Sequence, residues 1–446
     1  MNAVRMLAYV MILFALTGCG SSAGPFAGKT GEAGAALDVG LNPVLPAPQK
    51  SWLPIVDIAP AVGWPADKTP LAAPGLQVHA FASGLDHPRW LYVLPNGDVL
   101  VAESNAPAKP QGAQSLREWV AGMIMARAGA GVPSANRITL LRDTTGDGKA
   151  DLQTVMLEGL NSPFGMVLVG DSLYVANTDA VLRFPYARGQ TRITAPGIRV
   201  VELPAGPINH HWTKNLIASQ DGRTLYVTVG SNSNAGERGM AVEAGRASIW
   251  AVDVRTGKHR EMATGMRNPN GLTWEPHSGK LWTVVNERDE LGNNLVPDYL
   301  TAVTDGAFYG WPWSWYGQHV DTRVIPPNPA RVAQAVVPDY ALGSHVAPLG
   351  LAAVQNQALL PSLAQGMFVG EHGSWNRKPP SGYAVVFVTF AAGQPTGAPP
   401  LSVLSGFLAA NGDAYGRPVG VALEANGALL VADDVGNTVW RVSAAR

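Results

Sequence analysis

The sequence predicts an all-β fold, a six-bladed β-propeller, preceded by an N-terminal signal segment and an extended arm. The 446 residues include 50 glycines, 35 prolines and 13 tryptophans but only 15% charged residues. This composition is typical of many tight turns between apolar strands. In addition, one apolar strand pattern recurs six times, and a second short element precedes each copy. Length alone would also allow two or three separate domains, so the repeat decides the prediction.

The recurring strand starts at a turn that contains glycine, continues through apolar residues and ends at a polar residue. Its central valines lie 52 to 85 residues apart, at Val101, Val175, Val227, Val284, Val369 and Val431. A constant strand with uneven spacing indicates one structural unit with loops of variable length. Units of this size are typical of propeller blades, whereas six copies are difficult to place in a β-sandwich.

The element that precedes the recurring strand reads Pro-x-Gly in four of the six units. The four copies are Pro163-Phe164-Gly165, Pro269-Asn270-Gly271, Pro348-Leu349-Gly350 and Pro418-Val419-Gly420. The other two units carry the variants Pro88-Arg89-Trp90 and Trp212-Thr213-Lys214-Asn215-Leu216. Each blade is therefore predicted to begin with a strand entered from a Pro/Gly turn, which then forms a hairpin with the recurring strand.

The first residues resemble a bacterial lipoprotein signal. A short apolar run, 6–16, follows Arg5 and ends at Leu16-Thr17-Gly18-Cys19, which includes the only cysteine. We therefore expect residues 1–18 to be a signal peptide and Cys19 to be lipidated; an ordinary secretory signal with a chance cysteine is the alternative. Residues 19–75 are predicted to form a tether and a packed arm, and residues 76–446 the propeller. Gly20 in place of an aspartate favours the outer membrane, facing the periplasm.

One segment interrupts the strand pattern. Residues 114–129 show helical spacing of apolar side chains and are predicted to be an insertion in the first blade. Packing is its favoured role, with a lid or a membrane-facing patch as alternatives.

The net charge of −1 excludes a strongly basic protein that binds nucleic acid by neutralising phosphates.

Basic and polar residues gather just before or within the Pro/Gly elements, in a chain that has few charges. They are Arg89, His210, His211, Arg267, Asn268, His345 and Arg417. The innermost strands of a propeller line its channel, so these positions should converge on one mouth. For any one of these residues taken alone, the alternative is that it only caps the end of a strand. A ring of guanidinium groups suits a planar polyacid ligand, and an imidazole among them is a candidate general base.

Six segments in this order resemble the pyrroloquinoline quinone (PQQ)-dependent sugar dehydrogenases, and most closely the L-sorbosone dehydrogenase branch of the soluble glucose dehydrogenase group. The resemblance covers roughly residues 75–446. The segments are His210–Leu216 (HHWTKNL), Gly265–Gly271 (GMRNPNG), Asn286–Gly292 (NERDELG), Phe308–Pro312 (FYGWP), Gly370–Arg377 (GEHGSWNR) and Tyr415–Gly420 (YGRPVG). Each segment alone is weakly specific, whereas six in order on a six-bladed pattern are specific.

The resemblance implies that PQQ and Ca²⁺ bind on top of the propeller. PQQ is a planar tricarboxylate with an ortho-quinone, so it suits the predicted ring. By position, His211 matches the catalytic histidine, which takes the proton from the sugar's anomeric hydroxyl while hydride passes to the quinone. Arg267 and Asn268 match the pair that holds the quinone end of the cofactor.

The resemblance also assigns the remaining cofactor contacts. Arg417 matches an arginine that binds a cofactor carboxylate, and Asp413 is expected to orient it. Arg89 is expected to hold another carboxylate. The loop expected to cover the cofactor contributes His372, Trp375 and Arg377.

The calcium ligands are less directly implied. In the glucose dehydrogenases, carbonyl groups of a Gly-Pro pair after the fourth blade bind Ca²⁺, and this chain has Arg288-Asp289 there. The backbone of this pair and the Asp289 carboxylate are the expected ligands. A second acidic stretch, 143–151, looks like a calcium loop but lacks the distal glutamate and flanking helices, so we expect it to close a hairpin. Trp311, Trp313, Trp315 and Tyr316 are expected either to stack on a sugar or to pack between blades.

The expected function is a PQQ-dependent dehydrogenase that oxidises an aldose, a sorbosone-like sugar-aldehyde or another sugar. Electrons should pass to a periplasmic cytochrome or a quinone, and a lipid anchor should hold the protein on the membrane. No Gly-x-Gly-x-x-Gly follows a predicted strand into a helix, which argues against a nicotinamide cofactor. A metal-dependent lactonase is one alternative, although it would need clustered acidic ligands rather than arginines. A non-enzymatic propeller for binding or assembly is the other.

Overall fold

The computed structural model describes residues 38–49, 56–108, 126–355 and 357–445. The predicted signal and Cys19 lie outside the described residues, as does most of the predicted helical insertion. Of that insertion only its end is described, as a five-residue π-helical turn η1 (Ala126–Ala130) in which Gly129 departs from helical geometry. In the described part of the chain, no helix has the length and apolar character needed to cross a membrane.

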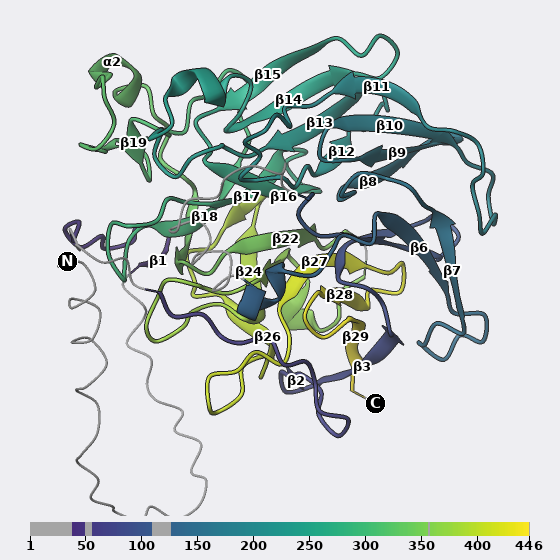
Figure 1. The fold of residues 1–446 in the computed structure, drawn as a ribbon. Coiled ribbons are helices and arrows are strands. Elements are labelled where there is room, and N and C mark those ends of the chain that lie inside the picture. Colours follow the sequence, from purple (N-terminus) through teal and green to yellow (C-terminus); the bar gives the residue numbers. More distant parts are fainter. Residues whose placement is uncertain (1–37, 50–55, 109–125, 356, 446) are drawn as a thin grey trace, which may run out of the picture. The chain divides into compact units, whose positions relative to one another are not determined.

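Six antiparallel sheets of at least four strands form the blades, which confirms the predicted six-bladed β-propeller (Figure 1). Blade one holds β4 (Pro88–Val93), β5 (Val99–Glu103), β6 (Arg137–Arg142) and β7 (Leu152–Leu157). Blade two holds β8 (Met166–Val169), β9 (Ser172–Ala176), β10 (Ala180–Pro185) and β11 (Ile198–Glu202). Blade three holds β12 (Leu216–Ala218), β13 (Thr224–Val229), β14 (Ser248–Asp253) and β15 (His259–Thr264). The predicted recurring strand is the second strand of each blade.

The remaining three blades each receive a strand from the N-terminal part of the chain, blades four and five from the arm and blade six from the segment that follows it. Blade four holds β16 (Asn268–Trp274), β17 (Leu281–Asn286), β18 (Pro297–Ala302), β21 (Tyr340–Ser344) and β1 (Val39–Gly40). Blade five holds β22 (Pro348–Ala353), β23 (Gly366–Glu371), β24 (Ala384–Ala391), β26 (Leu401–Ser405) and β2 (Leu71–Ala72), with β25 (Gln394–Pro395) paired to β24. Blade six holds β27 (Pro418–Leu423), β28 (Leu429–Asp433), β29 (Thr438–Ala444) and β3 (Leu76–Ser83).

The glycine of the Pro-x-Gly element lies where neighbouring innermost strands meet. A Cβ added to Gly271 on β16 would lie 2.6 Å from the Leu351 Cβ on β22. A Cβ on Gly420 of β27 would lie 2.9 Å from the Arg89 carbonyl oxygen on β4. Only glycine therefore allows the innermost strands to pack this closely around the axis.

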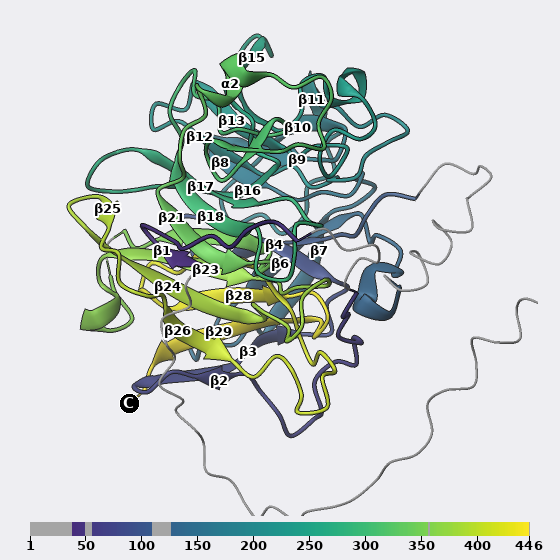
Figure 2. The same cartoon turned by 90° about the vertical axis from the view of Figure 1, so that its left-hand side faces the viewer.

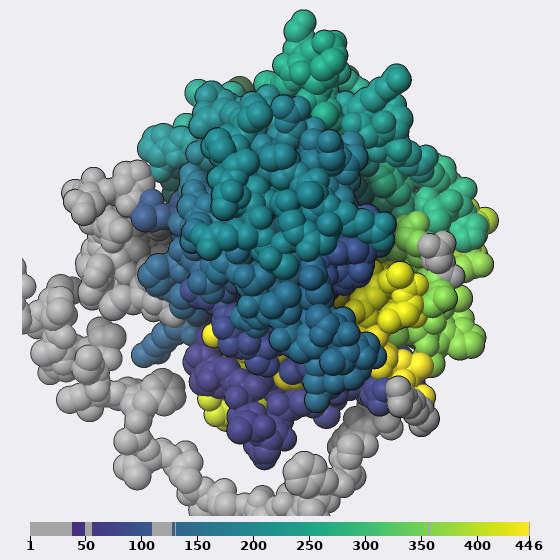
Figure 3. All heavy atoms as spheres, turned by 90° about the vertical axis from the view of Figure 1, so that its right-hand side faces the viewer, coloured from purple at the N-terminus to yellow at the C-terminus, as the bar shows by residue number. Residues whose placement is uncertain are grey.

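The two ends of the chain close the ring together. β3 pairs with β29 along the full length of both strands, from Leu76 opposite Ala444 to Ser83 opposite Thr438. Figure 3 shows the purple N-terminal residues against the yellow C-terminal ones on the surface. β1 and β2 extend blades four and five at their outer edges, against β21 and β26 (Figure 2). The arm thus covers part of the outer edges of β21 and β26.

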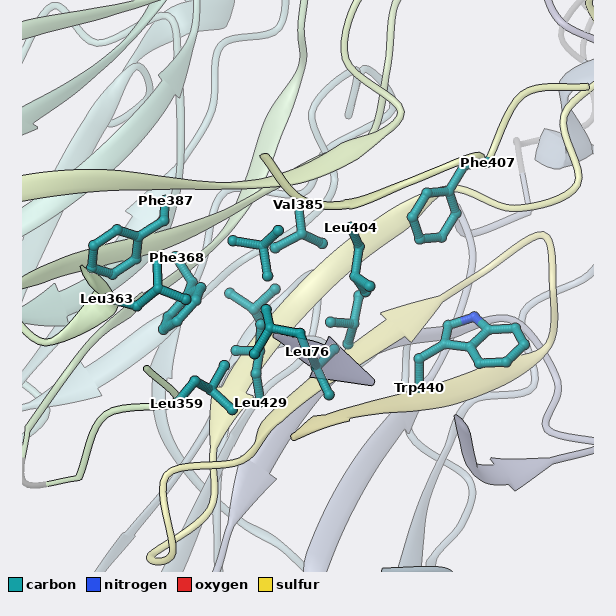
Figure 4. Packing of buried hydrophobic residues seen from close by; sticks show 14 of the residues in the cluster. Leu76, Leu359, Leu363, Phe368, Val385, Phe387, Leu404, Phe407, Leu429 and Trp440 are labelled. Carbon is teal, nitrogen blue, oxygen red and sulfur yellow. The ribbon is translucent and has the colours of Figure 1, made fainter. Parts of the chain in front are cut away.

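Apolar residues fill the spaces between blades. One large cluster lies between blades five and six and joins Phe387 and Leu404 to Leu429 and Trp440 (Figure 4). Full burial of a leucine or phenylalanine side chain contributes roughly 1.5–3 kcal/mol to folding. Since the described chain offers no disulfide, this inter-blade packing stabilises the fold.

One long insertion separates β18 from β21 and carries the aromatic residues named above. It contains β19 (Ser314–Trp315), β20 (His319–Val320) and the short helix α2 (Pro329–Val332). Trp311, Trp315 and Tyr316 are buried, so they pack rather than offer a face to a sugar; only Trp313 is partly exposed. Two 3-10 turns, η2 (Met240–Glu243) and η3 (Pro361–Leu363), complete the described elements.

The predicted hairpin at 143–151 is confirmed. It joins β6 to β7, and the Asp143 carboxylate accepts hydrogen bonds from the Gly146 and Gly148 amides at 2.7 and 2.8 Å. The carboxylate therefore stabilises the turn.

Candidate functional site

His211 lies in the connection between β11 and β12, at the entrance to an innermost strand. Its Nδ1 is 2.7 Å from the Ser231 carbonyl oxygen. A carbonyl only accepts hydrogen bonds, so Nδ1 carries the proton and Nε2 keeps its lone pair. Burial, with smaller contributions from His210 and Arg267, lowers the pKa of His211 well below its ordinary value. At neutral pH His211 is therefore an uncharged imidazole with a free acceptor nitrogen, as a general base requires.

Arg267 directly precedes β16 and belongs to a buried polar cluster. Its guanidinium donates to the Glu287 carbonyl oxygen at 2.7 Å and to an Asp289 carboxylate oxygen at 2.9 Å. The other oxygen of Asp289 accepts from Asn376 Nδ2 at 2.8 Å and lies 3.5 Å from His345 Nδ1. Burial alone would raise the pKa of Asp289, but Arg267 and His345 outweigh it and lower the pKa to about 2. Asp289 is thus the charged partner of Arg267.

Asn268 begins β16 beside His211. Gly230, which follows β13, lies against both side chains: a Cβ added there would overlap Asn268 Oδ1 and lie 2.5 Å from His211 Cβ. Asn268 Oδ1 is buried and has no hydrogen-bond partner among the described residues. The missing side chain at Gly230 therefore allows His211 and Asn268 to lie side by side.

Arg89 belongs to a second buried cluster, centred on Asp434. One Asp434 oxygen contacts the Arg89 guanidinium, lies 2.9 Å from His372 Nε2 and lies 3.6 Å from His87 Nε2. Burial alone would raise the pKa of Asp434, but His372, His87 and Arg89 lower it well below its ordinary value. This carboxylate fixes Arg89 and His372 relative to each other.

Arg417 directly precedes β27. The prediction that Asp413 orients its guanidinium is wrong. Asp413 instead accepts from Asn411 Nδ2 at 2.6 Å, within its own turn. Asp433 accepts a hydrogen bond from the Arg417 amide at 2.8 Å, and the Arg417 guanidinium donates to the Tyr383 hydroxyl at 3.0 Å. Asp413 lies in a tight local turn, whose short-range hydrogen bonds satisfy its carboxylate.

The segment that follows β23 links the two clusters. It carries His372, which contacts Asp434, and Asn376, which contacts Asp289. Trp375 is partly exposed and accepts a backbone hydrogen bond from Asp57 at 2.9 Å, so the arm holds this segment from outside. Arg377 donates to the Ser344 carbonyl at 3.3 Å and to Asn294 Oδ1 at 3.2 Å.

The structure gives the predicted metal-binding pair another role. Arg288 is fully buried, forms an ion pair with Asp321, and donates to the Pro312 and Ser314 carbonyls at 3.0 and 2.7 Å. Its side chain fastens the aromatic insertion to blade four, so the predicted ligands at this pair are the backbone carbonyls and the Asp289 carboxylate, not the guanidinium. Across the described ranges, no group of three or more His, Cys, Asp or Glu side chains is arranged to hold a metal ion.

Several residues of the site escaped the sequence analysis. Asp434, Asn376 and Tyr383 each contact a predicted site residue, and Ser231 sets the tautomer of His211. Only Asp434 left a usable signal, because two consecutive aspartates end a buried strand in a chain that has few charges. The other contacts join segments far apart in the chain.

Gly230 provides a steric test of this arrangement. In the Gly230→Ala variant, the new methyl group would meet both Asn268 and His211, which must move apart. We expect activity to fall on the order of 10²-fold, since a displacement of about 1 Å at a reacting group has that effect. The matched control is Gly206→Ala, because a Cβ at Gly206 meets nothing within 4 Å and neither glycine has positive φ. Equal activities of the two variants in steady-state assays would contradict the close approach.

Comparison with other proteins gives the chain's family. The sequence model of a family described as TrAA12-like matches residues 122–300 and 330–445. An uncharacterized protein of Borreliella burgdorferi is 27% identical over 241 residues, which make up 54% of this chain and 62% of that relative. This match spans less than two thirds of the relative's length.

Solved structures share the fold. A calcium structure of a Trichoderma reesei carbohydrate-active enzyme of family AA12 has a TM-score of 0.68 at 18% identity, over 88% of this chain and 100% of that one. The holo form of the PQQ domain of Coprinopsis cinerea pyranose dehydrogenase has a TM-score of 0.65 at 21% identity, over 86% and 100%. The apo form of the soluble aldose sugar dehydrogenase of Escherichia coli has a TM-score of 0.55 at 17% identity, over 83% and 100%.

The two ranges matched by the family model together span more than half of the 446 residues. The family resemblance predicted from the sequence is therefore confirmed, and the chain belongs to the TrAA12-like family.

Proposed function

We propose that the chain is a PQQ-dependent oxidoreductase that oxidises a sugar or a sugar-aldehyde. The observation that carries the proposal is that an uncharged His211 and three buried arginines all lie at the entrances to innermost strands. Innermost strands of a propeller run in one direction, so Arg89, Arg267 and Arg417 face the same mouth. The fold and family of the structural relatives, which include a PQQ-bound domain, support the same function.

The arginines fit an anionic planar cofactor. The Nε atoms of Arg89, Arg267 and Arg417 are buried and have no hydrogen-bond partner in the described part of the chain. Buried donors without partners are costly, so a ligand that offers carboxylate oxygens would stabilise them. These three residues, together with Asn268, would hold PQQ, and PQQ would supply a quinone able to accept a hydride.

His211 would then accept the proton that the substrate hydroxyl releases. Its Nε2 lone pair can accept the hydrogen of a substrate hydroxyl, while Ser231 keeps the ring in the required tautomer. As the proton arrives, the imidazolium is stabilised by the carbonyl that already accepts from Nδ1. The surrounding positive charge opposes premature protonation of His211 from solvent.

The side chains at the expected calcium position do not fit Ca²⁺. Asp289 already pairs with Arg267 and Asn376, and Arg288 is itself a cation committed to Asp321. Calcium remains an additive to be varied in the assay, because a Trichoderma reesei AA12 relative was solved with it.

The proposal is tested by reconstitution of the purified protein with PQQ, with and without Ca²⁺. A panel of aldoses and sugar-aldehydes is then offered together with an artificial electron-accepting dye. We expect saturable PQQ binding and sugar-dependent dye reduction. Folded protein that fails to bind PQQ under both conditions would refute the proposal and favour a non-enzymatic binding propeller. A His211→Gln protein serves as the control for background dye reduction.

We further propose that the enzyme is anchored by a lipid on Cys19 in the outer membrane and passes electrons to a periplasmic cytochrome or a quinone. The sequence pattern around Cys19 supports the anchor. Metabolic labelling with a fatty acid, compared between the natural chain and Cys19→Ala, tests it directly.

A further inference from the structure

Arg246 is a buried cation behind His211 that the proposed cofactor site does not use. It lies between η2 and β14 and is almost fully buried. Its guanidinium donates to the Gly230 carbonyl at 2.9 Å, the Pro204 carbonyl at 2.7 Å and Asn209 Oδ1 at 2.8 Å. All three acceptors are uncharged, and none of the ion pairs between described residues includes Arg246. A buried charge is costly unless it is paired or hydrogen-bonded, so these three hydrogen bonds are what stabilise Arg246 in place.

The acceptors of Arg246 belong to the two segments that hold His211. Pro204 and Asn209 lie in the segment that leads into His211. Gly230 is followed by Ser231, whose carbonyl oxygen fixes the imidazole tautomer. A single guanidinium therefore fastens the segment that carries the imidazole to the segment that orients it.

Further hydrogen bonds extend this support to the far side of His211. Asn209 Nδ2 donates to the Thr178 hydroxyl at 2.7 Å, and that hydroxyl donates to the Trp212 carbonyl at 2.8 Å. Lys214 Nζ, fully buried, donates to the carbonyls of His211 and Trp212 at 3.2 and 3.1 Å. The backbone on both sides of the imidazole is thus fixed by buried donors.

The charge of Arg246 adds a smaller effect, because burial, His210 and Arg267 each lower the pKa of His211 more than Arg246 does. Burial lowers the pKa of Arg246 to about 10, against an opposing effect of Glu243, so the guanidinium stays protonated at neutral pH. Glu243 itself is occupied by the Asn232 amide and the Ser233 hydroxyl. The charged or titratable groups that face His211 are His210, Arg267 and Arg246; those that face His210 are Arg267, Asp289, Glu237 and Arg238.

We propose that Arg246 is a positioning residue for His211: its guanidinium joins the segment that carries the imidazole to the segment that orients it. The importance of this role for turnover rests on the proposed function, in which His211 is the base. The geometric argument does not depend on that function.

The test compares Arg246→Met, Arg246→Lys and the exposed control Arg255→Met. The main measurement is the ¹⁵N NMR titration of His211 in the full chain without cofactor. The chain has nine histidines, so the His211 signal can be assigned with His211→Gln. We expect the His211 titration midpoint to move to higher pH in Arg246→Met and to stay near the wild-type position in Arg246→Lys, which keeps the charge, and in Arg255→Met.

Steady-state kinetics gives the second measurement. Arg246→Met should lower kcat on the order of 10²-fold with little change in KM, because it displaces the base rather than the substrate. It should also move the acidic limb of the kcat/KM profile to higher pH. Arg246→Lys should lower kcat, since lysine lacks the planar fork, without moving that limb.

A folded Arg246→Met protein in which His211 keeps its titration midpoint and its ¹⁵N shifts would overturn the proposal, because the imidazole would then hold its orientation and tautomer without Arg246. If that variant does not fold, Arg246→Gln takes its place, with the same expected shift. If the wild-type protein turns over no sugar, the proposed function fails, but the titration still decides the role of Arg246.

Discussion

His211→Gln should abolish sugar-dependent turnover while PQQ binding is retained. Glutamine can still donate to the Ser231 carbonyl, but it offers no nitrogen lone pair at the position of Nε2. The loss of a general base costs on the order of 10²–10⁴-fold in rate. The measurements are kcat from dye reduction and the PQQ dissociation constant from titration. His277→Gln is the matched control, because its ring is mostly exposed and pairs only with Glu275.

The pH dependence should follow from the same residue. The pKa of His211 is lowered well below 6.5, and only the unprotonated ring can accept a proton. Wild-type kcat/KM should therefore stay flat as the pH falls from neutral through 6.5, and should decline only at more acidic pH. Full activity of His211→Gln, or a decline centred at an ordinary histidine pKa, would show that His211 is not the base.

Asp434→Asn should cause the largest loss of stability among single changes at the site. Asp434 is buried and holds Arg89, His372 and His87, and removal of its charge leaves the buried Arg89 guanidinium without its counter-ion. Removal of one partner from a buried ion pair costs about 3–5 kcal/mol. Urea unfolding followed by fluorescence would measure the loss, and PQQ affinity should also fall because Arg89 loses its orientation.

Asp413→Asn is the matched control for this change. Its carboxylate accepts only from Asn411 in an exposed turn, so we expect a small change in the free energy of unfolding. The acid dependence gives an independent measurement. Because the folded-state pKa of Asp434 is lowered, its ion pairs contribute fully above about pH 4, the unfolded value, and are lost as the pH falls through the folded pKa. The Asp434→Asn protein should lose less stability on acidification; equal acid sensitivity would contradict the ion-pair role.

The sequence by itself determined the blade number and the position of the catalytic candidates. A Gly-apolar strand and a Pro-x-Gly entry recur because every blade has the same inner packing problem, and local patterns record a local requirement. His211, Arg267 and Arg417 could be named because each precedes an innermost strand at an equivalent place in the repeat.

Only the tertiary structure decided which residues serve these groups. The pairing of β3 with β29 and the partners Asp434, Asn376, Tyr383 and Arg246 join segments separated by tens to hundreds of residues. No periodic pattern encodes such contacts, since they depend on how blades close around one axis. For the same reason the sequence suggested Asp413, a near neighbour of Arg417, whereas the Arg417 guanidinium contacts Tyr383. Spacing predicts where a backbone repeats, but hydrogen bonds between blades depend on the folded ring.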